Sequence, residues 1–289
     1  MLPRPAHPVA RAALWMGGAL ASFIAMAIAG RELSKELTTF QILFFRSIVG
    51  LAAVSILLHR AGWTQIRTRV FGTHLIRNVA HFGGQFGWFY GLALIPLTEV
   101  FAIEFTMPIW TALLATLILG ERMNRLRSLA VGVGFIGVLV ILRPGLAAVS
   151  PAALAVLASA ALYATSHVFT KRMSTTETPL TILFYMTVIQ LPLALIPSLP
   201  NWLWPSAPLW PWVLVVALTA LSAHYCLARA FRLADATVVV PMDFLRLPLV
   251  ALLGLVLYGE ALKIWVVLGA AIILLAAWLN LRSAQSARS

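Results

Sequence analysis

Ten apolar runs follow one another along this 289-residue sequence, each bounded by charged residues or by proline and glycine. Most are about 20 residues long, which at a rise of ~1.5 Å per residue lets a helix cross a hydrocarbon core of ~30 Å. Only 10% of the residues are charged, against about 25% in an average soluble domain. We therefore expect an all-α integral membrane protein with ten transmembrane helices, over residues 12–30, 38–58, 73–95, 98–119, 127–142, 151–170, 179–197, 210–231, 236–258 and 263–281.

One of these runs, at residues 98–121, has a second copy at residues 237–260. A shift of 139 positions (237 − 98) places Glu104 on Asp243 and Gly120 on Gly259. The sequence therefore predicts an internal duplication with five helices in each copy, a first repeat over residues 12–145 and a second over residues 150–282. Because five is odd, the second repeat should enter the membrane inverted. Inverted repeats around a central cavity are typical of secondary transporters.

Lys and Arg are unevenly distributed between the two predicted sides of the membrane. With the N-terminus inside, 14 of the 21 fall in cytoplasmic segments and four fall in outer segments. An excess of positive charge marks the cytoplasmic side. We therefore expect cytoplasmic tails at residues 1–11 and 283–289 and a location in the cell inner membrane. The scatter of basic residues between apolar runs also argues against nucleic acid as a partner, despite a net charge of +12.

Side-chain patterns that would support catalysis or a bound metal are scarce. The single cysteine, Cys226, and the six histidines lack the spacings of thiolate clusters and of HExxH sites. Residues 132–137, GVGFIG, match the dinucleotide pattern G-x-G-x-x-G, but they lie inside an apolar run and no acidic residue follows before Glu177. We interpret them as a small-residue face for helix packing. The sequence predicts no enzyme, no cofactor and no metal.

The motifs and their order resemble the EamA family of the drug/metabolite transporter superfamily. The resemblance is carried by residues 90–123, YGLALIPLTEVFAIEFTMPIWTALLATLILGERM, and by residues 161–172, ALYATSHVFTKR, and it extends over residues 12–282. Within that family the aromatic-rich composition is most similar to the YddG-like exporters of aromatic and other neutral amino acids. The resemblance implies ten helices around a cavity lined chiefly by helices 1, 3, 4, 6, 8 and 9.

Several of the predicted helices carry polar side chains at membrane depth, where such groups are costly and usually face a cavity. The third run places His74, Asn78, His81 and Gln85 on one helical face, with Trp88 next. Serines such as those at positions 22, 159 and 222 are explained equally well by helix packing. The side chains that we expect along the substrate path are those of His81, Gln85, Trp88, Tyr163, His167, His224 and Tyr225.

The duplicated acids, Glu104 and Asp243, are the strongest candidates for a role in transport. Glu104 should lie ~9 Å from the outer end of its helix and Asp243 about as deep from the cytoplasmic end, which places them in opposite leaflets. Pro108 and Pro248 follow these acids, and a proline inside a helix leaves a backbone carbonyl unpaired. We therefore expect a helix kink beside each acid.

Two arginines are candidate partners for these acids. Arg246 lies three residues after Asp243 and can pair with it along one helix face, as a structural ion pair or as part of the site. Glu104 has no such neighbour. Arg46, in the second run, is either its distant partner or a ligand for a substrate carboxylate.

Taken together, these features predict a secondary transporter that exports a small organic solute by alternating access. From the resemblance, the first candidate substrates are aromatic or other neutral and hydrophobic amino acids. A broad exporter of drugs or of another metabolite is the alternative, and a membrane-integral enzyme or scaffold is a distant one because the loops are short. In the absence of a nucleotide-binding motif, transport would run downhill or on an ion gradient, with Glu104 and Asp243 as proton carriers. Membrane lipid and a small-molecule substrate are the expected partners of a monomer or homodimer.

Overall fold

The computed structural model describes residues 8–120, 124–143, 149–173, 176–233, 239 and 242–286, and regular structure in these ranges is helical throughout. The predicted tails lie mostly outside them, although α1 already begins at Pro8 and α12 continues to Ser286. Glu121 and Thr237, which belong to the duplicated motif, also lie outside the described residues. The longer helices are α1 Pro8–Leu33, α2 Thr39–Ala61, α3 Phe71–Leu94, α4 Leu97–Glu104, α5 Met107–Leu119, α6 Arg125–Leu142, α7 Pro151–Met173, α8 Pro179–Ser198, α9 Trp210–Leu233, α11 Arg246–Tyr258 and α12 Ile264–Ser286.

Seven of the described helical segments are long and apolar enough to cross a membrane. One of these seven segments, Leu97–Ile118, consists of α4 and most of α5 taken together. α3 is not among them, because its polar side chains lower its hydropathy although it is 24 residues long. α11 and the Ile264–Asn280 part of α12 are apolar but shorter.

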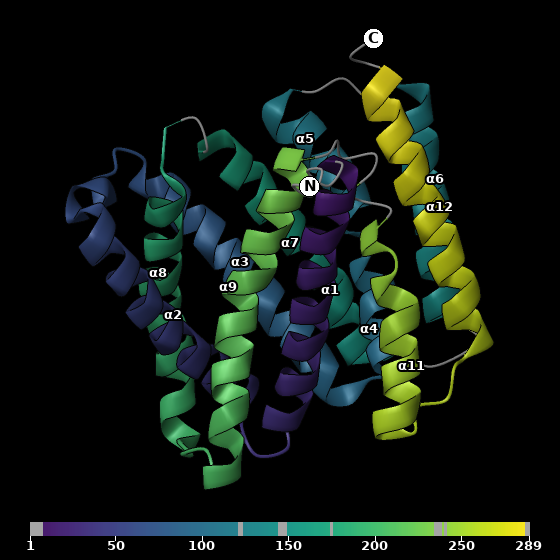
Figure 1. Ribbon diagram of the computed structural model, residues 1–289. Helices are drawn as coiled ribbons and strands as arrows, with labels where there is room; N and C mark the ends of the chain where they lie inside the picture. Colours follow the sequence, from purple (N-terminus) through teal and green to yellow (C-terminus); the bar gives the residue numbers. More distant parts are fainter. Residues whose placement is uncertain are drawn as a thin grey trace, which may run out of the picture.

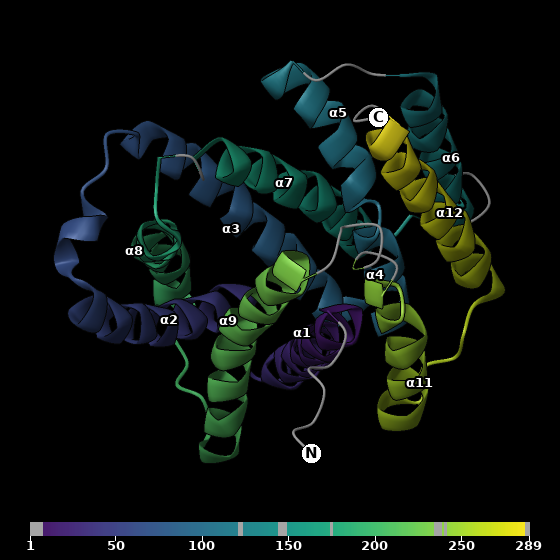
Figure 2. The same ribbon diagram turned by 45° about the horizontal axis from the view of Figure 1, so that its top comes forward.

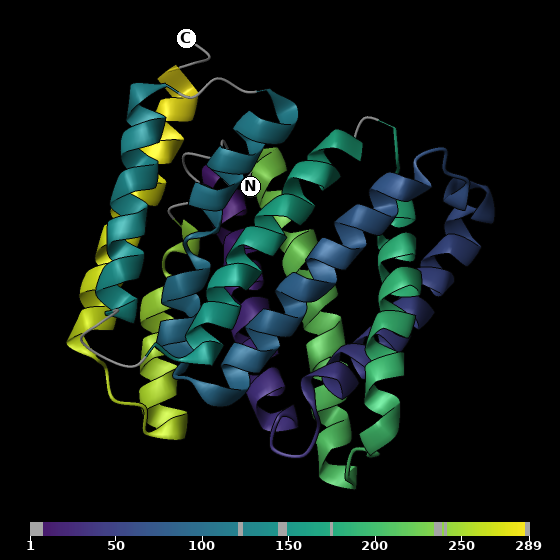
Figure 3. The same ribbon diagram turned by 180° about the vertical axis from the view of Figure 1, so that it is seen from behind.

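The helices pack in pairs that join distant parts of the sequence. α1 runs along α9, α3 along α7, α2 along α8, and α6 along α12. Figure 2 shows α2 and α8 on one side of the bundle and α6 and α12 on the other. The view from behind shows α3 and α7 crossing the middle of the bundle (Figure 3). Each half of the chain therefore supplies one helix to every pair.

The two ends of the bundle differ in the chain segments that they carry. α1 begins and α12 ends at the same end, which we call the near end (Figure 1). The near end also carries the connections from α2 to α3 and from α7 to α8. The opposite end, the far end, carries the connections from α1 to α2, α3 to α4, α8 to α9, and α11 to α12.

Local sequence explains where several helices begin and end. The Thr38 and Thr178 side chains cap α2 and α8 by accepting hydrogen bonds from backbone amides three residues on. Gly120 and Gly259 end α5 and α11 with φ of 69° and 65°, a left-handed conformation that glycine adopts without a steric penalty.

Glycines allow α6 and α12 to approach closely, as the small-residue interpretation of residues 132–137 requires. A Cβ atom on Gly137 would lie 2.9 Å from the carbonyl oxygen of Gly269, and one on Gly269 would lie 2.7 Å from that of Gly137. A Cβ atom on Gly134 would collide with Ile109. A Cβ atom on Gly132 would have no atom within 4 Å, so this glycine does not take part in the close packing.

Candidate functional site

Interruptions in two helices place the candidate acids inside the bundle. α4 ends at Glu104 and α5 begins at Met107, so the helix stops just before Pro108. The backbone turns at residues 105 and 106, and the Thr106 carbonyl accepts the first hydrogen bonds of α5. In the second half of the chain, residues 244 and 245 form a turn, and Pro248 is the third residue of α11.

One guanidinium group joins both acids. Arg246 Nη1 lies 3.4 Å from Glu104 Oε1, and Arg246 Nη2 lies 3.1 Å from Asp243 Oδ2. The Trp88 indole donates a 2.8 Å hydrogen bond to the other oxygen of Glu104. We call these four residues the acid cluster. Two carboxylates and one guanidinium give it a formal charge of −1 in a low-dielectric setting.

The position of the two acids in opposite leaflets is a prediction that the structure contradicts. A single arginine side chain reaches both carboxylates, so they lie at nearly the same depth. The prediction used the helix rise to estimate how far each acid lies from the end of its own helix. It could not take into account that the two interrupted helices meet at their interruptions, which brings the acids together. The prediction of Arg46 as the partner of Glu104 is also wrong, because Arg246 takes that place.

Aromatic rings surround the shared arginine. Its guanidinium carbon lies 4.7 Å from the centre of the Phe23 ring and 5.1 Å from the centres of the Phe101 and Phe105 rings. Contacts of this kind stabilise a cation that has left water. They hold Arg246 in place while it binds two anions.

A second group of polar residues, which we call the basic cluster, consists of Arg46, Arg77 and His81. The three side chains are close enough for their charges to interact. The Arg77 side chain donates hydrogen bonds to Thr170 Oγ1 at 3.1 Å and to Asn78 Oδ1 at 2.6 Å. His81 Nδ1 lies 2.9 Å from the amide nitrogen of Gln190 on α8. All three members are buried.

Phe23 and Tyr163 lie between the two clusters. The Phe23 ring that contacts Arg246 also meets the His224 ring edge-on, with 5.9 Å between the ring centres. Tyr163 lies 5.5 Å from His81, ring to ring, and it interacts electrostatically with both Glu104 and Arg46. Tyr163 therefore lies between the acid cluster and the basic cluster, and we call the region between these two clusters the chamber.

Two histidines lie near the basic cluster. His167 and His224 are exposed, although their charges interact with each other and with those of Arg46 and Arg77. Ser22 and Ser222 are hydrogen-bonded to each other across α1 and α9 at 2.8 Å, also in an exposed position.

Two of the predicted path residues lie apart from these contacts. Tyr225 is exposed and packs against Trp15, with ring centres 5.8 Å apart. Gln85 is buried, and its side-chain oxygen has no hydrogen-bond partner among the described residues. Ser159 donates to the Gly84 carbonyl, which is a helix-packing contact. Among the described residues, no group of three His, Cys, Asp or Glu side chains forms a metal site.

Polar contacts join several connections at the far end. Arg31 on α1 forms a 3.0 Å ion pair with Glu260, which follows α11. The other Glu260 oxygen accepts a 2.8 Å hydrogen bond from the Leu97 amide at the start of α4. Tyr258 donates to Glu32 at 3.0 Å. These contacts tie α1, α4 and α11 together at the far end.

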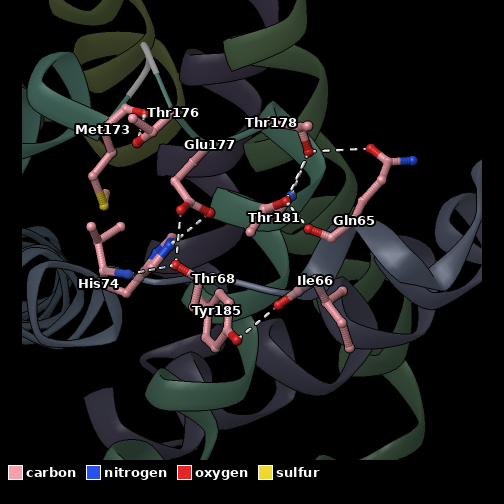
Figure 4. Close-up of polar contacts among 11 residues, drawn as sticks. Gln65, Ile66, Thr68, His74, Met173, Thr176, Glu177, Thr178, Thr181 and Tyr185 are labelled. Atoms are coloured by element: carbon pink, nitrogen blue, oxygen red, sulfur yellow. Dashed lines mark hydrogen bonds and ion pairs between the residues drawn. The ribbon is translucent and has the colours of Figure 1, made fainter.

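A separate set of contacts joins two connections at the near end (Figure 4). Glu177 accepts a 2.8 Å hydrogen bond from Thr68 and lies 3.3 Å from His74 Nε2. The His74 ring packs on Tyr185 with 4.4 Å between centres, and Tyr185 donates to the Ile66 carbonyl at 2.9 Å. This set joins the connection between α2 and α3 to α3 itself and to α8, and α1 and α9 contribute none of its residues.

Sequence reasoning missed Gln190, Arg31 and Glu260. Gln190 could have been found, because an amide in the apolar α8 sequence requires a partner. The pairing of Arg31 with Glu260 spans 229 residues (260 − 31) and depends on tertiary packing.

Comparisons with known proteins agree with this architecture. The EamA-like transporter family matches residues 10–143 and again residues 150–282. A solved crystal structure superposes with a TM-score of 0.66 at 18% identity and covers 96% of this chain and 99% of that one, a likeness of fold.

Several curated transporters align with most of the chain. A riboflavin transporter of Rhizobium johnstonii is 34% identical over 227 residues, 78% of this chain and 75% of the relative. An S-adenosylmethionine uptake transporter of Rickettsia prowazekii is 26% identical and covers 81% of this chain and 79% of its own length. The pseudopaline exporter CntI of Pseudomonas aeruginosa is 27% identical over 85% of this chain and 87% of its own. The chain therefore belongs to the EamA-like transporter family of the drug/metabolite transporter superfamily and is a multi-pass membrane transporter, not an enzyme.

Proposed function

We propose that this protein carries a small aromatic metabolite with charged groups across the cell inner membrane by alternating access. The observation that carries the proposal is the arrangement of an acid cluster and a basic cluster on either side of Tyr163, with the Phe23 ring against Arg246 of the acid cluster. Aromatic rings suit a flat solute, and the clusters suit opposite charges at its two ends.

Matching features at opposite ends of the bundle support a construction from two inverted five-helix repeats, residues 12–145 and 150–282. Thr38 caps α2 at the far end, and Thr178, which is 140 positions later (178 − 38), caps α8 at the near end. Three residues after each cap, Gln41 donates to the Leu203 carbonyl and Thr181 donates to the Gln65 carbonyl. Equivalent residues thus make equivalent contacts on opposite sides, as ten spans in two inverted repeats require.

The orientation that we propose places the near end, with both termini, in the cytoplasm. It rests on the excess of Lys and Arg in the segments at that end. With this orientation, the Arg31–Glu260 ion pair faces the outside and closes the chamber there. We propose that the described conformation is the one closed toward the outside.

Two classes of substrate fit the chamber. Relatives that are named as transporters of riboflavin and of S-adenosylmethionine favour a heterocyclic metabolite. Export of aromatic amino acids, the class favoured by the YddG-like resemblance, fits the same arrangement of rings and charges. Both classes combine a flat ring with a polar or charged end.

The acid cluster gives a physical route to proton coupling. Arg246 neutralises one of the two carboxylates, so the other retains a charge at membrane depth, where charge is costly. A proton or the cationic group of a solute can offset that charge. We propose that Glu104 and Asp243 exchange a proton for the cationic group of the solute during transport.

Counterflow in proteoliposomes tests this proposed function. Vesicles preloaded with one unlabelled solute are diluted into a trace of the labelled form, for riboflavin, S-adenosylmethionine, phenylalanine and tryptophan in turn, with and without a pH gradient. We expect transient accumulation of at least one of these solutes, and its loss in Arg246→Met but not in Arg60→Gln, an exposed control. No accumulation of any of them by correctly folded protein would contradict the proposed substrate class.

A further inference from the structure

Arg46 on α2 is a buried cation without an anionic partner among the described residues. Its exposed fraction is 7%, and its Nε atom has no hydrogen-bond partner. An unpaired charge at membrane depth costs several kcal/mol and is usually retained for function. The role of Arg46 is therefore not explained by the helix packing.

The described carboxylates are all engaged elsewhere. Each has a hydrogen bond or an ion pair with a group other than Arg46 or Arg77. These carboxylates belong to Glu32, Glu36, Glu99, Glu104, Glu177, Asp243 and Glu260. Among the described residues, no carboxylate therefore pairs with Arg46 or Arg77, and an anionic group of a bound solute would supply the missing charge.

Arg46 is not sealed by its neighbours. It lines a small pocket between α2, α8 and α9. Ser47 lines the same pocket and offers a hydroxyl group, whereas the Gln190 amide nitrogen already contacts His81 Nδ1 and the Asn78 carbonyl. Arg77 and His81 add like charge and polarity nearby. A guanidinium beside neutral hydrogen-bond donors matches the two oxygens of a carboxylate or phosphate.

We propose that Arg46 binds the carboxylate or phosphate group of the transported solute, which deepens the proposed function and rests on it. The ring of the solute then lies beside Phe23 and Tyr163, and any cationic group points to the acid cluster. The chamber selects for an anionic group at one end, so a neutral analogue of the same shape binds more weakly. Carboxylate and phosphate share this chemistry and are separated by experiment.

Binding by purified protein in detergent free of anionic lipid gives a test that does not require transport. Two matched pairs are used, phenylalanine against phenethylamine, which lacks the carboxylate, and riboflavin 5′-phosphate against riboflavin. The variants are Arg46→Gln and Arg46→Lys, with Arg60→Gln as the exposed control. Ligand-induced stabilisation and dissociation constants are measured for each pair, and thermal unfolding is recorded without ligand.

In the wild type we expect the anionic member of at least one pair to bind about tenfold or more tightly than its neutral or cationic analogue. The pair of ligands that shows this difference in affinity identifies the group that Arg46 binds as a carboxylate or as a phosphate. In Arg46→Gln the difference should fall below about twofold, and Arg46→Lys should keep part of it. Arg46→Gln should unfold at the same or a higher temperature without ligand, because it removes an unpaired buried charge.

Equal preference in the wild type and in Arg46→Gln, or no preference for an anion in either pair, would overturn the inference. A lower unfolding temperature of unliganded Arg46→Gln would show a structural role instead. If the anionic preference is present but counterflow is absent, the binding site stands and the proposed transport fails. If counterflow is observed but the preference for the anionic ligand is absent, the Arg46 binding site is refuted and the proposed transport stands.

Discussion

Glu104 and Arg246 come from segments 142 residues apart, yet they form one ion pair beside an indole donor. The pairing of Asp243 with Arg246 could be predicted from their spacing of three residues on one helix, and it is present at 3.1 Å. The contact with Glu104 could not, because it depends on where two interrupted helices meet. Local spacing determines local pairs, whereas the acid cluster is a product of tertiary packing.

Neutral substitutions of the two acids test their role in transport. We expect Glu104→Gln and Asp243→Asn each to lower counterflow at least about tenfold, because a hydrogen bond to a charged group contributes ~1.5–3 kcal/mol. Expression and membrane insertion should be unchanged, as judged by gel filtration of the purified variants. Glu36→Gln is the control, since Glu36 is exposed and contacts Ser206 at the far end. Wild-type flux in both acid variants would exclude the proposed role.

The Trp88 hydrogen bond is a second test at the level of single residues. Trp88→Phe keeps the buried ring and removes the indole donor to Glu104. We expect weaker transport, with a change in its pH dependence, because Glu104 loses one group that stabilises its charged form. Trp204→Phe is the matched control, since Trp204 is exposed. Identical pH profiles for Trp88→Phe and the wild type would show that this hydrogen bond does not influence the acid.

Among the elements, most helix bounds were predictable to within a few residues. The run expected at 179–197 is α8 at Pro179–Ser198, and that at 127–142 is α6 at Arg125–Leu142. Apolar length and charged ends determine these bounds, and both can be read locally. The pairing of α1 with α9 and of α3 with α7 was not predictable in detail, because no local signal records which helix faces meet.

The glycines of α6 give an element-level prediction about packing. Gly137→Ala should destabilise the protein by about 1–3 kcal/mol, because the added methyl group meets the Gly269 carbonyl and Ile273. Gly132→Ala is the matched control on the same helix, and it should be neutral or slightly stabilising, since no atom lies within 4 Å. Thermal unfolding in detergent measures both. An equal effect of the two substitutions would contradict the α6–α12 interface.

At the scale of the whole molecule, opposite ends of the bundle carry different ties. The far-end contacts include α1, α4 and α11, whereas the near-end contacts of Glu177 and Tyr185 hold α2, α3 and α8. The far-end ties of α1 and α11 have no counterpart in the near-end contacts of Glu177 and Tyr185, although α1 also packs along α9. Movement of these helices about the chamber is the motion that alternating access requires.

The proposed orientation leads to a labelling prediction for intact cells. Single cysteines replace Ser206 at the far end and Thr64 at the near end, in a Cys226→Ser background. A membrane-impermeant thiol reagent should label the position at 206 from outside, and the position at 64 only after the membrane is permeabilised. The reverse pattern would invert the orientation, and labelling of both from outside would refute a transmembrane arrangement of the two ends.

The most direct measurement is the accessibility of the chamber from each side of the membrane. A cysteine at Ser222, which is exposed and hydrogen-bonded to Ser22 on α1, is placed in the Cys226→Ser background and treated with an impermeant thiol reagent from either side of oriented vesicles. Without substrate we predict labelling from the near-end side only, and labelling from the far-end side once Glu260→Gln removes the ion pair with Arg31. Equal labelling from both sides in the otherwise unaltered protein, or no far-side labelling after Glu260→Gln, would contradict a chamber that is closed by the far-end contacts.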